Sequence, residues 1–301
     1  MKTFRMSLVL VAFAMIVPAC GGVGVQPTPS PTALPPTPTA TIEPLAARVN
    51  GDFITLASFE AELARYRAVH SVSGTDPATS SEDVLTVLNA RIDRMLLAQG
   101  ALEVGIMIDV NEVAAHIDQL AADLGGLEAV AAWLAAQGYS AEEFELALQE
   151  DMLARAMVDH LTQDIARIQE HVRARHILVT TSEEAQDIQA RLAAGETFEE
   201  LARNLSTDPS TRPAGGDLGW FPRNTLLIPE VETTAFELQT GAISDVIESS
   251  LGFHIIETIA RESRVITEEN LLRQQEWTVS EWLDQRRQNA DITVYITPET
   301  W

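Results

Sequence analysis

Three short segments in the C-terminal half of this chain contain the residues best suited to chemistry. Their sequences are RHILV, GGDLGWF and GFHII, at residues 175–179, 215–221 and 252–256. His176 and His254 lie in the first and last of them, and Asp208 precedes the middle one. Imidazole and carboxylate side chains can transfer protons, bind a metal ion or stabilise charge on a substrate. Each can also be an ordinary hydrogen-bonded residue, the histidines in a core and the aspartate in a loop.

Two other kinds of site use these residue types. A metal site with two histidines and one carboxylate is one interpretation, but the sequence has no local histidine spacing such as i, i+4. A Ser-His-Asp hydrolase would place its nucleophile in a Gly-x-Ser-x-Gly turn, which the sequence also lacks. We therefore predict neither a metal nor hydrolase chemistry at these residues.

The three segments, in this order and at this spacing, resemble the parvulin family of peptidyl-prolyl isomerases over residues 171–262. The resemblance implies that His176 and His254 lie side by side on neighbouring strands. It places Asp208 opposite the substrate carbonyl group and Ser249 in the hydrogen-bond network of the histidines. The histidines are then expected to be largely structural, each fixing the tautomer of the other, while Asp208 supplies the electrostatic contribution.

The reaction implied by this resemblance is rotation about the peptide bond that precedes proline. The barrier is ~18–20 kcal/mol because the twisted amide loses its resonance. Uncatalysed exchange takes roughly tens of seconds, which is slow enough to limit folding. Because no bond is broken, we expect no cofactor, metal or covalent intermediate.

The resemblance also assigns an apolar pocket for the proline ring. Its residues are Leu218, Leu226 or Leu227, Val231 and Phe236, with Phe221 beside them. The family usually has methionine and phenylalanine where this chain has a leucine and Val231. There is also one extra residue between Phe221 and Pro229, so a shallower pocket is expected. The same side chains also fit ordinary packing beneath a loop.

The loop after the first strand bears on substrate choice. Phosphate-directed parvulins carry a basic cluster there, whereas residues 180–184 of this chain read TTSEE. Two carboxylates would repel a phosphorylated substrate. We predict no preference for phosphoserine.

The local pattern of this region is α/β without reference to any family. Strands are predicted at residues 175–179, 242–248 and 253–259, and helices at residues 183–194 and 198–204. A small sheet flanked by helices is the expected result.

Residues 45–170 are predicted to be helical. Signals that start helices occur at Ser58, at Asp109 with Glu112, and at Ser140 with Glu143. Together with the segment RVNG at residues 48–51, this order of elements resembles the N-terminal helical chaperone domain of PrsA- and SurA-type extracytoplasmic foldases.

Residues 263–301 contain one more predicted helix, capped by Thr267 and ending at Arg286 and Arg287, where cations complement the helix dipole. In the foldase family this segment returns to the N-terminal helices. The predicted fold class is therefore α+β. It combines a helical domain at residues 45–170, an inserted parvulin domain with a small antiparallel sheet flanked by helices at residues 171–262, and a C-terminal helix that packs on the helical domain.

The first 20 residues resemble a bacterial lipoprotein signal peptide. Lys2 and Arg5 precede an apolar run at residues 6–17, which leads to the sequence VPAC ending in Cys20. The run is short for a membrane span, which takes ~20 apolar residues. The resemblance makes Cys20 the lipid-modified first residue of the mature protein. An uncleaved anchor, or a secretory signal with an incidental cysteine, is the alternative, and in each case the protein leaves the cytoplasm.

A linker and an acidic composition are the remaining features. Residues 21–44 are rich in proline and threonine and are expected to form an extended tether. The net charge is −24, with 44 acidic and 20 basic residues, which argues against nucleic acid as a partner. The single cysteine cannot form an internal disulfide.

The leading hypothesis is an exported, lipid-anchored foldase that isomerises X-Pro bonds in unfolded or partly folded exported polypeptides. The alternative is a holding chaperone that binds such polypeptides through its helical and parvulin-like domains without significant catalysis. A surface-binding lipoprotein with neither activity is the third hypothesis. A homodimer is left open, as is the choice between the cell membrane and a periplasmic location in an envelope with two membranes.

Overall fold

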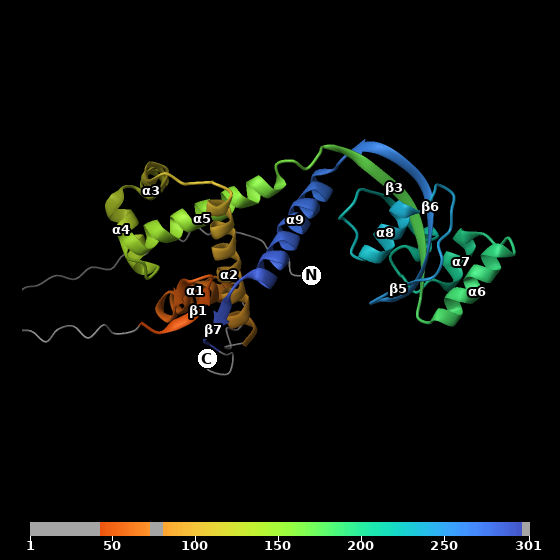
Figure 1. Ribbon diagram of the computed structural model, residues 1–301, viewed down its shortest axis with the longest axis horizontal. Coiled ribbons are helices and arrows are strands. Elements are labelled where there is room, and N and C mark those ends of the chain that lie inside the picture. Colours follow the sequence, from red (N-terminus) through yellow and green to blue (C-terminus); the bar gives the residue numbers. More distant parts are fainter. Residues whose placement is uncertain (1–42, 73–80, 297–301) are drawn as a thin grey trace, which may run out of the picture. The chain divides into compact units, whose positions relative to one another are not determined.

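The computed structural model describes residues 43–72 and 81–296 (Figure 1). The expected leader with Cys20 and most of the expected linker lie outside the described residues. The elements form two groups, which we call the helical part and the sheet module. The sheet module runs from β3 to β6, and the helical part comprises the elements before and after it in the sequence.

The helical part contains a small antiparallel sheet as well as helices. Its elements are β1 (Leu45–Val49), β2 (Asp52–Thr55), α1 (Leu56–Val72), α2 (Ser81–Glu103), α3 (Val110–Leu124), α4 (Leu127–Ala136), α5 (Ala141–Thr162), α9 (Glu268–Asn289) and β7 (Ile292–Val294). The strand order β2-β1-β7 pairs the first described strand with the last one.

A two-residue turn between β1 and β2 ties these strands together. Asn50 and Gly51 both have positive φ, 53° and 99°, as the type I′ turn of a tight hairpin requires. The backbone N–H of Asn50 donates to the carbonyl of Asp291, and the N–H of Asp291 donates to the Asn50 side chain, each at 2.9 Å. The Asn-Gly turn therefore also anchors the segment that enters β7.

The C-terminal helix α9 returns to the helical part. Trp282 packs against a buried cluster from α2 and α5 that includes Ala101 and Met157. Arg287, in the last turn of α9, pairs with Asp93 of α2 at 2.6 Å. The predicted α+β organisation, with a sheet module inserted between a helical part and its returning helix, is confirmed.

Replacing Gly100 with alanine is expected to loosen the docking of α9. A Cβ atom at Gly100 would lie 2.6 Å from two ring carbons of Trp282. Overpacking of this kind costs about 1–3 kcal/mol, which outweighs the gain of about 1 kcal/mol from alanine in a helix. Urea unfolding should therefore show a lower stability. In a Trp282→Phe background the clash is relieved, and the same substitution should become neutral or stabilising; equal losses in both backgrounds would contradict this.

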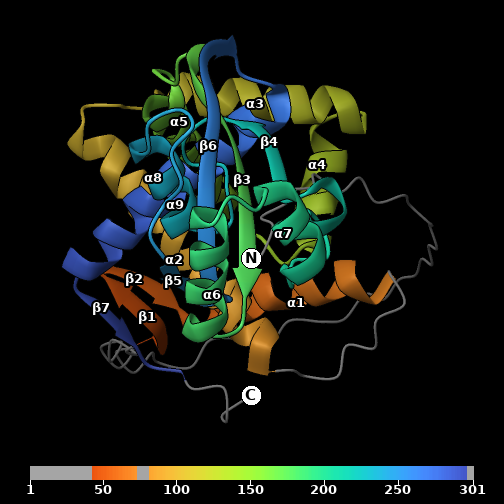
Figure 2. The same ribbon diagram turned by 90° about the vertical axis from the view of Figure 1, so that its right-hand side faces the viewer.

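The sheet module is built on four antiparallel strands in the order β4-β3-β6-β5. Its elements are β3 (Ile168–Val179), α6 (Ser182–Ala193), α7 (Phe198–Leu205), the short 3₁₀-helix η1 (Arg212–Ala214), β4 (Asp217–Phe221), α8 (Pro229–Glu237), β5 (Ile247–Ser249) and β6 (Gly252–Val265). Helices α6 and α7 cover one face, which Figure 2 shows from the front. Ile177 and Ile255 point to that face, and Ile256 belongs to a second cluster with residues of α8.

The central strands are longer than predicted. Residues 168–173 pair with residues 260–265 and extend β3 and β6 beyond the expected ends. The sequence of these extensions contains Gln169, Glu170 and Arg261, which interrupt the alternation of apolar and polar residues that would predict a strand. Residues 168–171 and 262–265, which have no partner on β4, form a two-stranded ribbon. The ribbon connects the module to α5 on one side and to α9 on the other.

The predicted strand at residues 242–248 is wrong in most of its length. Only Ile247–Ser249 forms β5, and Ile243 makes an isolated bridge to Glu257. The reason is Ser244, whose side-chain oxygen accepts from the backbone N–H of Ile256 at 3.0 Å. In a regular pair of strands, this N–H group would donate to a backbone carbonyl instead of a side chain.

The helix starts follow the predictions with one exception. Ser140 and Glu143 form the expected capping box of α5, Asp109 caps α3, and Thr267 caps α9. Ser58 does not start the first helix, which begins at Leu56. The side chain of Thr55 accepts from the N–H of Ser58 at 3.2 Å, because the end of β2 leads directly into α1.

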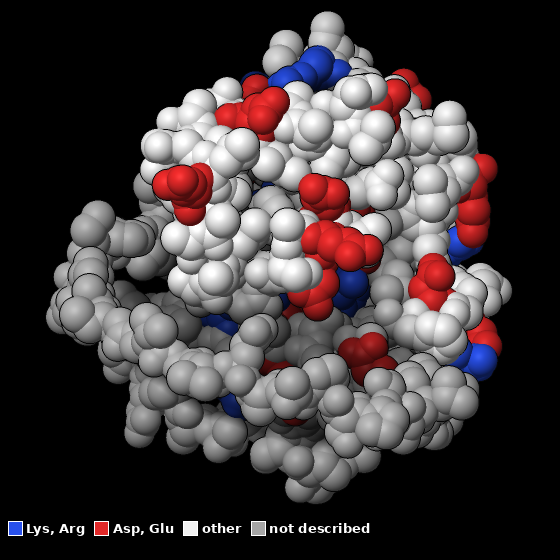
Figure 3. All heavy atoms as spheres, turned by 90° about the vertical axis from the view of Figure 1, so that its left-hand side faces the viewer, with Lys and Arg blue, Asp and Glu red and all other residues white. Residues whose placement is uncertain are grey.

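One face of the described residues agrees with the acidic composition. On the face drawn in Figure 3, acidic side chains are scattered among uncharged ones, and basic side chains are few. Within residues 43–72 and 81–296, no helix is both long and apolar enough to cross a membrane.

Candidate active site

Strands β3 and β6 bring the two histidines together. They pair His176 with Ile256 and Leu178 with His254, so both histidines lie diagonally on one face of the sheet. Their exposed fractions are 4% and 0%. The two Nδ1 atoms are 3.3 Å apart, and the rings stack with centroids 5.5 Å apart and planes inclined by 17°. The pair is therefore a rigid, buried unit.

Asp208 reaches this pair from the loop that follows α7. Its Oδ2 lies 2.8 Å from Nε2 of His176 and accepts from the hydroxyl of Thr211. Its Oδ1 accepts from the backbone N–H of Ser210 at 2.9 Å and from the Ser210 hydroxyl at 2.6 Å. The side chain is 15% exposed. Four donors thus hold a carboxylate that is not fully buried.

The same contacts keep Asp208 ionised. Burial by itself would raise the pKa of its carboxyl, but hydrogen bonds from Ser210, Thr211 and His176 outweigh burial and hold the pKa well below its ordinary value. An ionised carboxylate only accepts hydrogen bonds. Nε2 of His176 must therefore carry the hydrogen that it donates to Asp208.

When both rings are neutral, each hydrogen bond from Ser249 through the two histidines to Asp208 has a single direction. Because Nε2 of His176 donates to Asp208, its Nδ1 accepts from Nδ1–H of His254. Nε2 of His254 then accepts from the hydroxyl of Ser249, at 2.7 Å. This line of four side chains, which we call the histidine line, ends on the negative charge of Asp208.

The environment of His254 keeps its ring neutral. Burial, with a smaller effect from the adjacent His176, lowers the pKa of His254 from 6.5 to about 4. The unfolded chain takes up this proton at about pH 6.5, so below that pH it binds more protons than the folded chain. Stability contributed by His254 is therefore lost as the pH falls from 6.5 to 4.

Lowering the pH from 7 to 5 is expected to reduce the free energy of unfolding by about 2 kcal/mol through His254. Asp208 contributes little in this window, because its ordinary pKa of 3.8 lies below it. Urea unfolding at several pH values measures the loss. His254→Gln should show a smaller decline, and His116→Gln, on the exposed surface of α3, should decline like wild type. Parallel declines in wild type and His254→Gln would contradict the assignment.

An apolar cluster lies on the same face of the sheet as the histidines. Ile256, the strand partner of His176, belongs to it. Phe221, Val231 and Phe236 are members with exposed fractions of 4%, 2% and 5%. The rings of Phe221 and Phe236 meet edge to face with centroids 6.0 Å apart. These three predicted pocket residues form the buried floor of the cluster.

The loop before α8 distinguishes the two leucines that the sequence left open. Leu226 is partly buried and packs against the apolar cluster, whereas Leu227 is 69% exposed. Leu218 of β4 also packs against the cluster. The structure thus brings Leu218 and Leu226 to the cluster and leaves Leu227 on the surface.

Sequence reasoning missed Ser210 and Thr211. Both follow Asp208 within the segment DPST, and both bind its carboxylate. The signal was present, because an aspartate side chain commonly accepts from the backbone two residues later, and Ser or Thr nearby adds a hydroxyl.

A metal interpretation of the same side chains has no geometric counterpart. His176 and His254 face each other through their Nδ1 atoms, and Asp208 binds the opposite nitrogen of His176. Across the described ranges, no group of three or more His, Cys, Asp or Glu side chains is placed to hold a metal ion.

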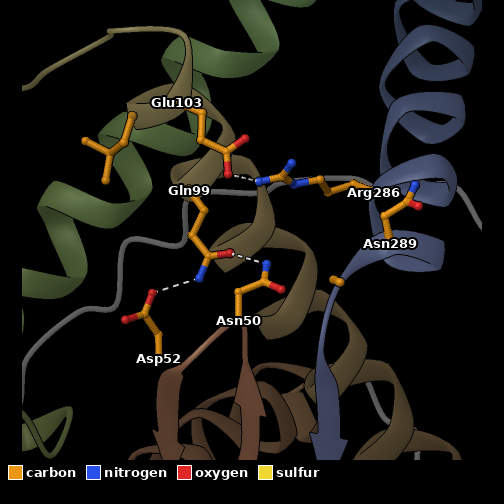
Figure 4. A pocket seen from close by; sticks show the side chains of 8 residues that line it. Asn50, Asp52, Gln99, Glu103, Arg286 and Asn289 are labelled. Carbon is orange, nitrogen blue, oxygen red and sulfur yellow. Dashed lines mark hydrogen bonds and ion pairs between the residues drawn. The ribbon is translucent and has the colours of Figure 1, made fainter.

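A separate cavity of about 440 Å³ lies in the helical part, between the β1–β2 turn, α2 and α9 (Figure 4). Gln99 donates to Asp52 at 2.7 Å and accepts from Asn50 at 2.8 Å, and Arg286 pairs with Glu103. Because these polar side chains bind one another, we interpret the cavity as part of the junction that holds the Asn-Gly turn.

Two family models match the chain. The SurA-like N-terminal domain matches residues 1–158, and the PPIC-type PPIASE domain matches residues 161–260. The first match covers more than half of the 301 residues. The second contains the histidine line and the apolar cluster.

Curated relatives are foldases. Foldase protein PrsA 2 of Bacillus cereus is 39% identical over 114 residues, which are 38% of this chain and 39% of that protein. Foldase protein PrsA of Caldanaerobacter subterraneus is 46% identical over 89 residues, 30% of this chain and 29% of that protein. The matched part of the chain thus spans about a third of the length of these relatives.

Two solved structures are similar to the chain, each with a TM-score below 0.5. The peptidylprolyl isomerase PrsA from Bacillus anthracis is 24% identical, covering 67% of this chain and 96% of that chain with a TM-score of 0.45. NmPin, the parvulin of Nitrosopumilus maritimus, is 36% identical over 31% of this chain and 98% of that chain, with a TM-score of 0.29. By its family matches, the chain belongs to the proteins with a SurA-like N-terminal domain and carries behind it a PPIC-type, or parvulin, domain.

Proposed function

We propose that this protein is a peptidyl-prolyl cis-trans isomerase that assists the folding of exported polypeptides containing X-Pro bonds. The proposal is carried by one arrangement, the histidine line ending on Asp208 beside the apolar cluster, within the region of the PPIC-type match. The foldase names of the relatives support the second half of the proposal.

Asp208 supplies the electrostatic part of the proposed mechanism. In a planar amide, resonance places negative charge on the carbonyl oxygen and positive charge on the nitrogen, and twisting removes both. A carboxylate beside the carbonyl oxygen disfavours the planar charge distribution and lowers the energy of the twisted amide relative to it. Because Ser210, Thr211 and His176 already hold the carboxylate, little reorganisation accompanies the step.

The remaining side chains have positioning and binding roles in this proposal. His176, His254 and Ser249 fix the orientation of the carboxylate through the histidine line. Leu218 and Leu226, the partly buried members of the apolar cluster, contact the proline ring. Phe221, Val231 and Phe236 support them from below.

A holding chaperone is the second candidate function. Val231 and Phe236 are 2% and 5% exposed, so the floor of the cluster offers the proline ring little open apolar surface. This observation favours weak binding of the ring, and hence a protein that keeps unfolded chains soluble without accelerating isomerisation.

Refolding of a client whose slow phase is limited by proline isomerisation separates the two functions. The chain without residues 1–20 is expected to accelerate the slow phase at substoichiometric concentration. Asp208→Ala should lose the acceleration and still reduce aggregation of the client. If wild type prevents aggregation but leaves the slow phase unchanged, the holding function stands and the isomerase function fails.

The proposal extends to the placement of the protein and its domains. The residues before Cys20 would be removed, and Cys20 would carry the lipid as the first residue of the mature protein. Residues 21–44 would tether a helical chaperone domain (45–170), an isomerase domain (171–262) and a returning segment (263–301). Phase partitioning of wild type against Cys20→Ala tests the anchor. Light scattering of the chain without residues 1–20 distinguishes a monomer from a homodimer.

No preference for phosphoserine forms part of the same proposal. Glu183 and Glu184 occupy the first turn of α6, directly after β3. The carboxylate of Glu184 accepts from Thr180 and Thr181, which lowers the pKa of Glu184 and keeps it charged. Peptides with phosphoserine before proline should therefore be poorer substrates than peptides with alanine there.

A further inference from the structure

The loop between β4 and α8, residues 222–228, contacts both the apolar cluster and the helix α9. Leu226 in this loop packs on the cluster. Asn224 adopts φ 60°, in the left-handed region that few residues other than glycine enter. A loop in this conformation needs outside contacts to hold it, and its position decides where Leu226 lies.

Glu232 of α8 holds the loop from the side of the cluster. Its carboxylate accepts from the backbone N–H groups of Asn224, Thr225 and Leu226 at 2.6, 2.9 and 2.9 Å. Glu232 itself is 8% exposed. Three consecutive N–H groups are thereby satisfied, and other groups must satisfy the loop carbonyls.

Gln274 of α9 holds the same loop from the other side. Its side-chain amide donates to the carbonyl of Arg223 at 2.7 Å, and the residue is 6% exposed. The amides of Gln274 and Gln169 exchange hydrogen bonds of 2.8 and 2.9 Å. Gln169, on β3, also donates to the carbonyl of Ala166 at 2.6 Å. Both donors and the oxygen of the Gln274 amide are therefore used, and its orientation is fixed.

Helix α9 carries this contact to the helical part. Arg273, next to Gln274, lies 3.4 Å from the carbonyl of Thr225. Two turns further along the same helix, Trp282 packs against α2 and α5. A single rigid helix thus contacts the loop of the apolar cluster near one end and the helical part near the other.

We infer that Gln274 is a positioning residue for the proline pocket: it fixes residues 222–228 so that Leu226 lies against the apolar cluster. Because Gln274 belongs to α9, the position of this loop depends on that helix. The kinetic consequence of this inference rests on the proposed isomerase function. The structural consequence, a loop that loosens when the Gln274 amide is removed, is independent of that function.

Hydrogen exchange tests the structural consequence. Gln274→Met keeps the length of the side chain and removes its donors, so the N–H groups of Asn224 and Thr225 should exchange about fivefold faster. Gln274→Ala should behave alike. Gln288→Ala, the same kind of change at an exposed position of α9, should leave the loop unchanged. Gln169→Ala provides a second route if the Gln274 variants do not fold, with a smaller increase expected.

Peptide kinetics on the whole chain without residues 1–20 test the functional consequence. Gln274→Met should raise KM about fivefold while kcat stays within about twofold, because the loop binds the ring and Asp208 is untouched. Unchanged loop exchange and unchanged KM in both Gln274 variants would overturn the inference. If wild type itself shows no catalysis, the proposed isomerase function fails, and the exchange rates alone decide the role of Gln274.

Discussion

Asp208→Ala is expected to lower kcat/KM for a proline-containing peptide by about a hundredfold, since removing one fixed electrostatic partner of a transition state has effects of this order. The protease-coupled peptide assay measures it. The fold should survive, because the Thr211 hydroxyl lies 3.0 Å from Nε2 of His176 and can accept the hydrogen bond that Asp208 gives up. We therefore expect Asp208→Ala to lower kcat/KM without lowering the amount of folded protein.

Two further variants sharpen this result. Asp208→Asn keeps a similar shape and removes the charge, so it should also lose at least about tenfold in kcat/KM if the charge matters. Asp187→Ala removes an aspartate of α6 that is 67% exposed and should retain the wild-type rate. A rate for Asp208→Ala equal to that of Asp187→Ala would remove Asp208 from the mechanism.

Gly216→Ala is expected to lower the stability of the protein more than Gly100→Ala does. The new Cβ would lie 2.1 Å from the carbonyl oxygen of His176. The carbonyl of Gly216 also accepts from the N–H of His176 at 2.9 Å, and the φ of Gly216 is 82°. Backbone strain and backbone overlap together should lower the free energy of unfolding by about 3 kcal/mol or more, and the displaced His176 should lose its contact with Asp208.

Gly219→Ala is the matched control for this prediction. Gly219 also has a positive φ, 71°, but a Cβ there would meet nothing within 4 Å. Only the conformational strain remains, which is about 1–2 kcal/mol. Urea unfolding and catalysis compare the two variants. If Gly216→Ala is no more destabilising than Gly219→Ala, the close approach to His176 does not matter.

The core of the site could be predicted from sequence because it lies in local motifs. His176 and His254 sit in apolar runs that read as strands, and the glycines of residues 215–221 mark close backbone approach. That the two histidine strands are neighbours follows from the family resemblance. The contacts of Asp208 were predictable only in part. Its place beside His176 follows from the family resemblance, whereas the roles of Ser210 and Thr211 depend on the turn that residues 208–211 adopt.

Several of the missed elements depend on partners that are distant in sequence. Strand β1 pairs with β7, and neither is long enough to show a pattern by itself. The ribbon of β3 and β6 has polar residues on both strands, so only their mutual pairing defines it. The contact between Gln274 and the carbonyl of Arg223 is of the same kind, because no local pattern distinguishes it from a surface glutamine.

The central claim is that the histidine line and the apolar cluster catalyse rotation about an X-Pro bond. Nuclear magnetic resonance exchange spectroscopy on a short peptide with one such bond measures this directly, without a protease or a client. With the folded chain lacking residues 1–20, the account predicts cis–trans exchange within a second, which neither the peptide alone nor Asp208→Ala produces. Exchange at the uncatalysed rate in the presence of folded wild type would contradict it.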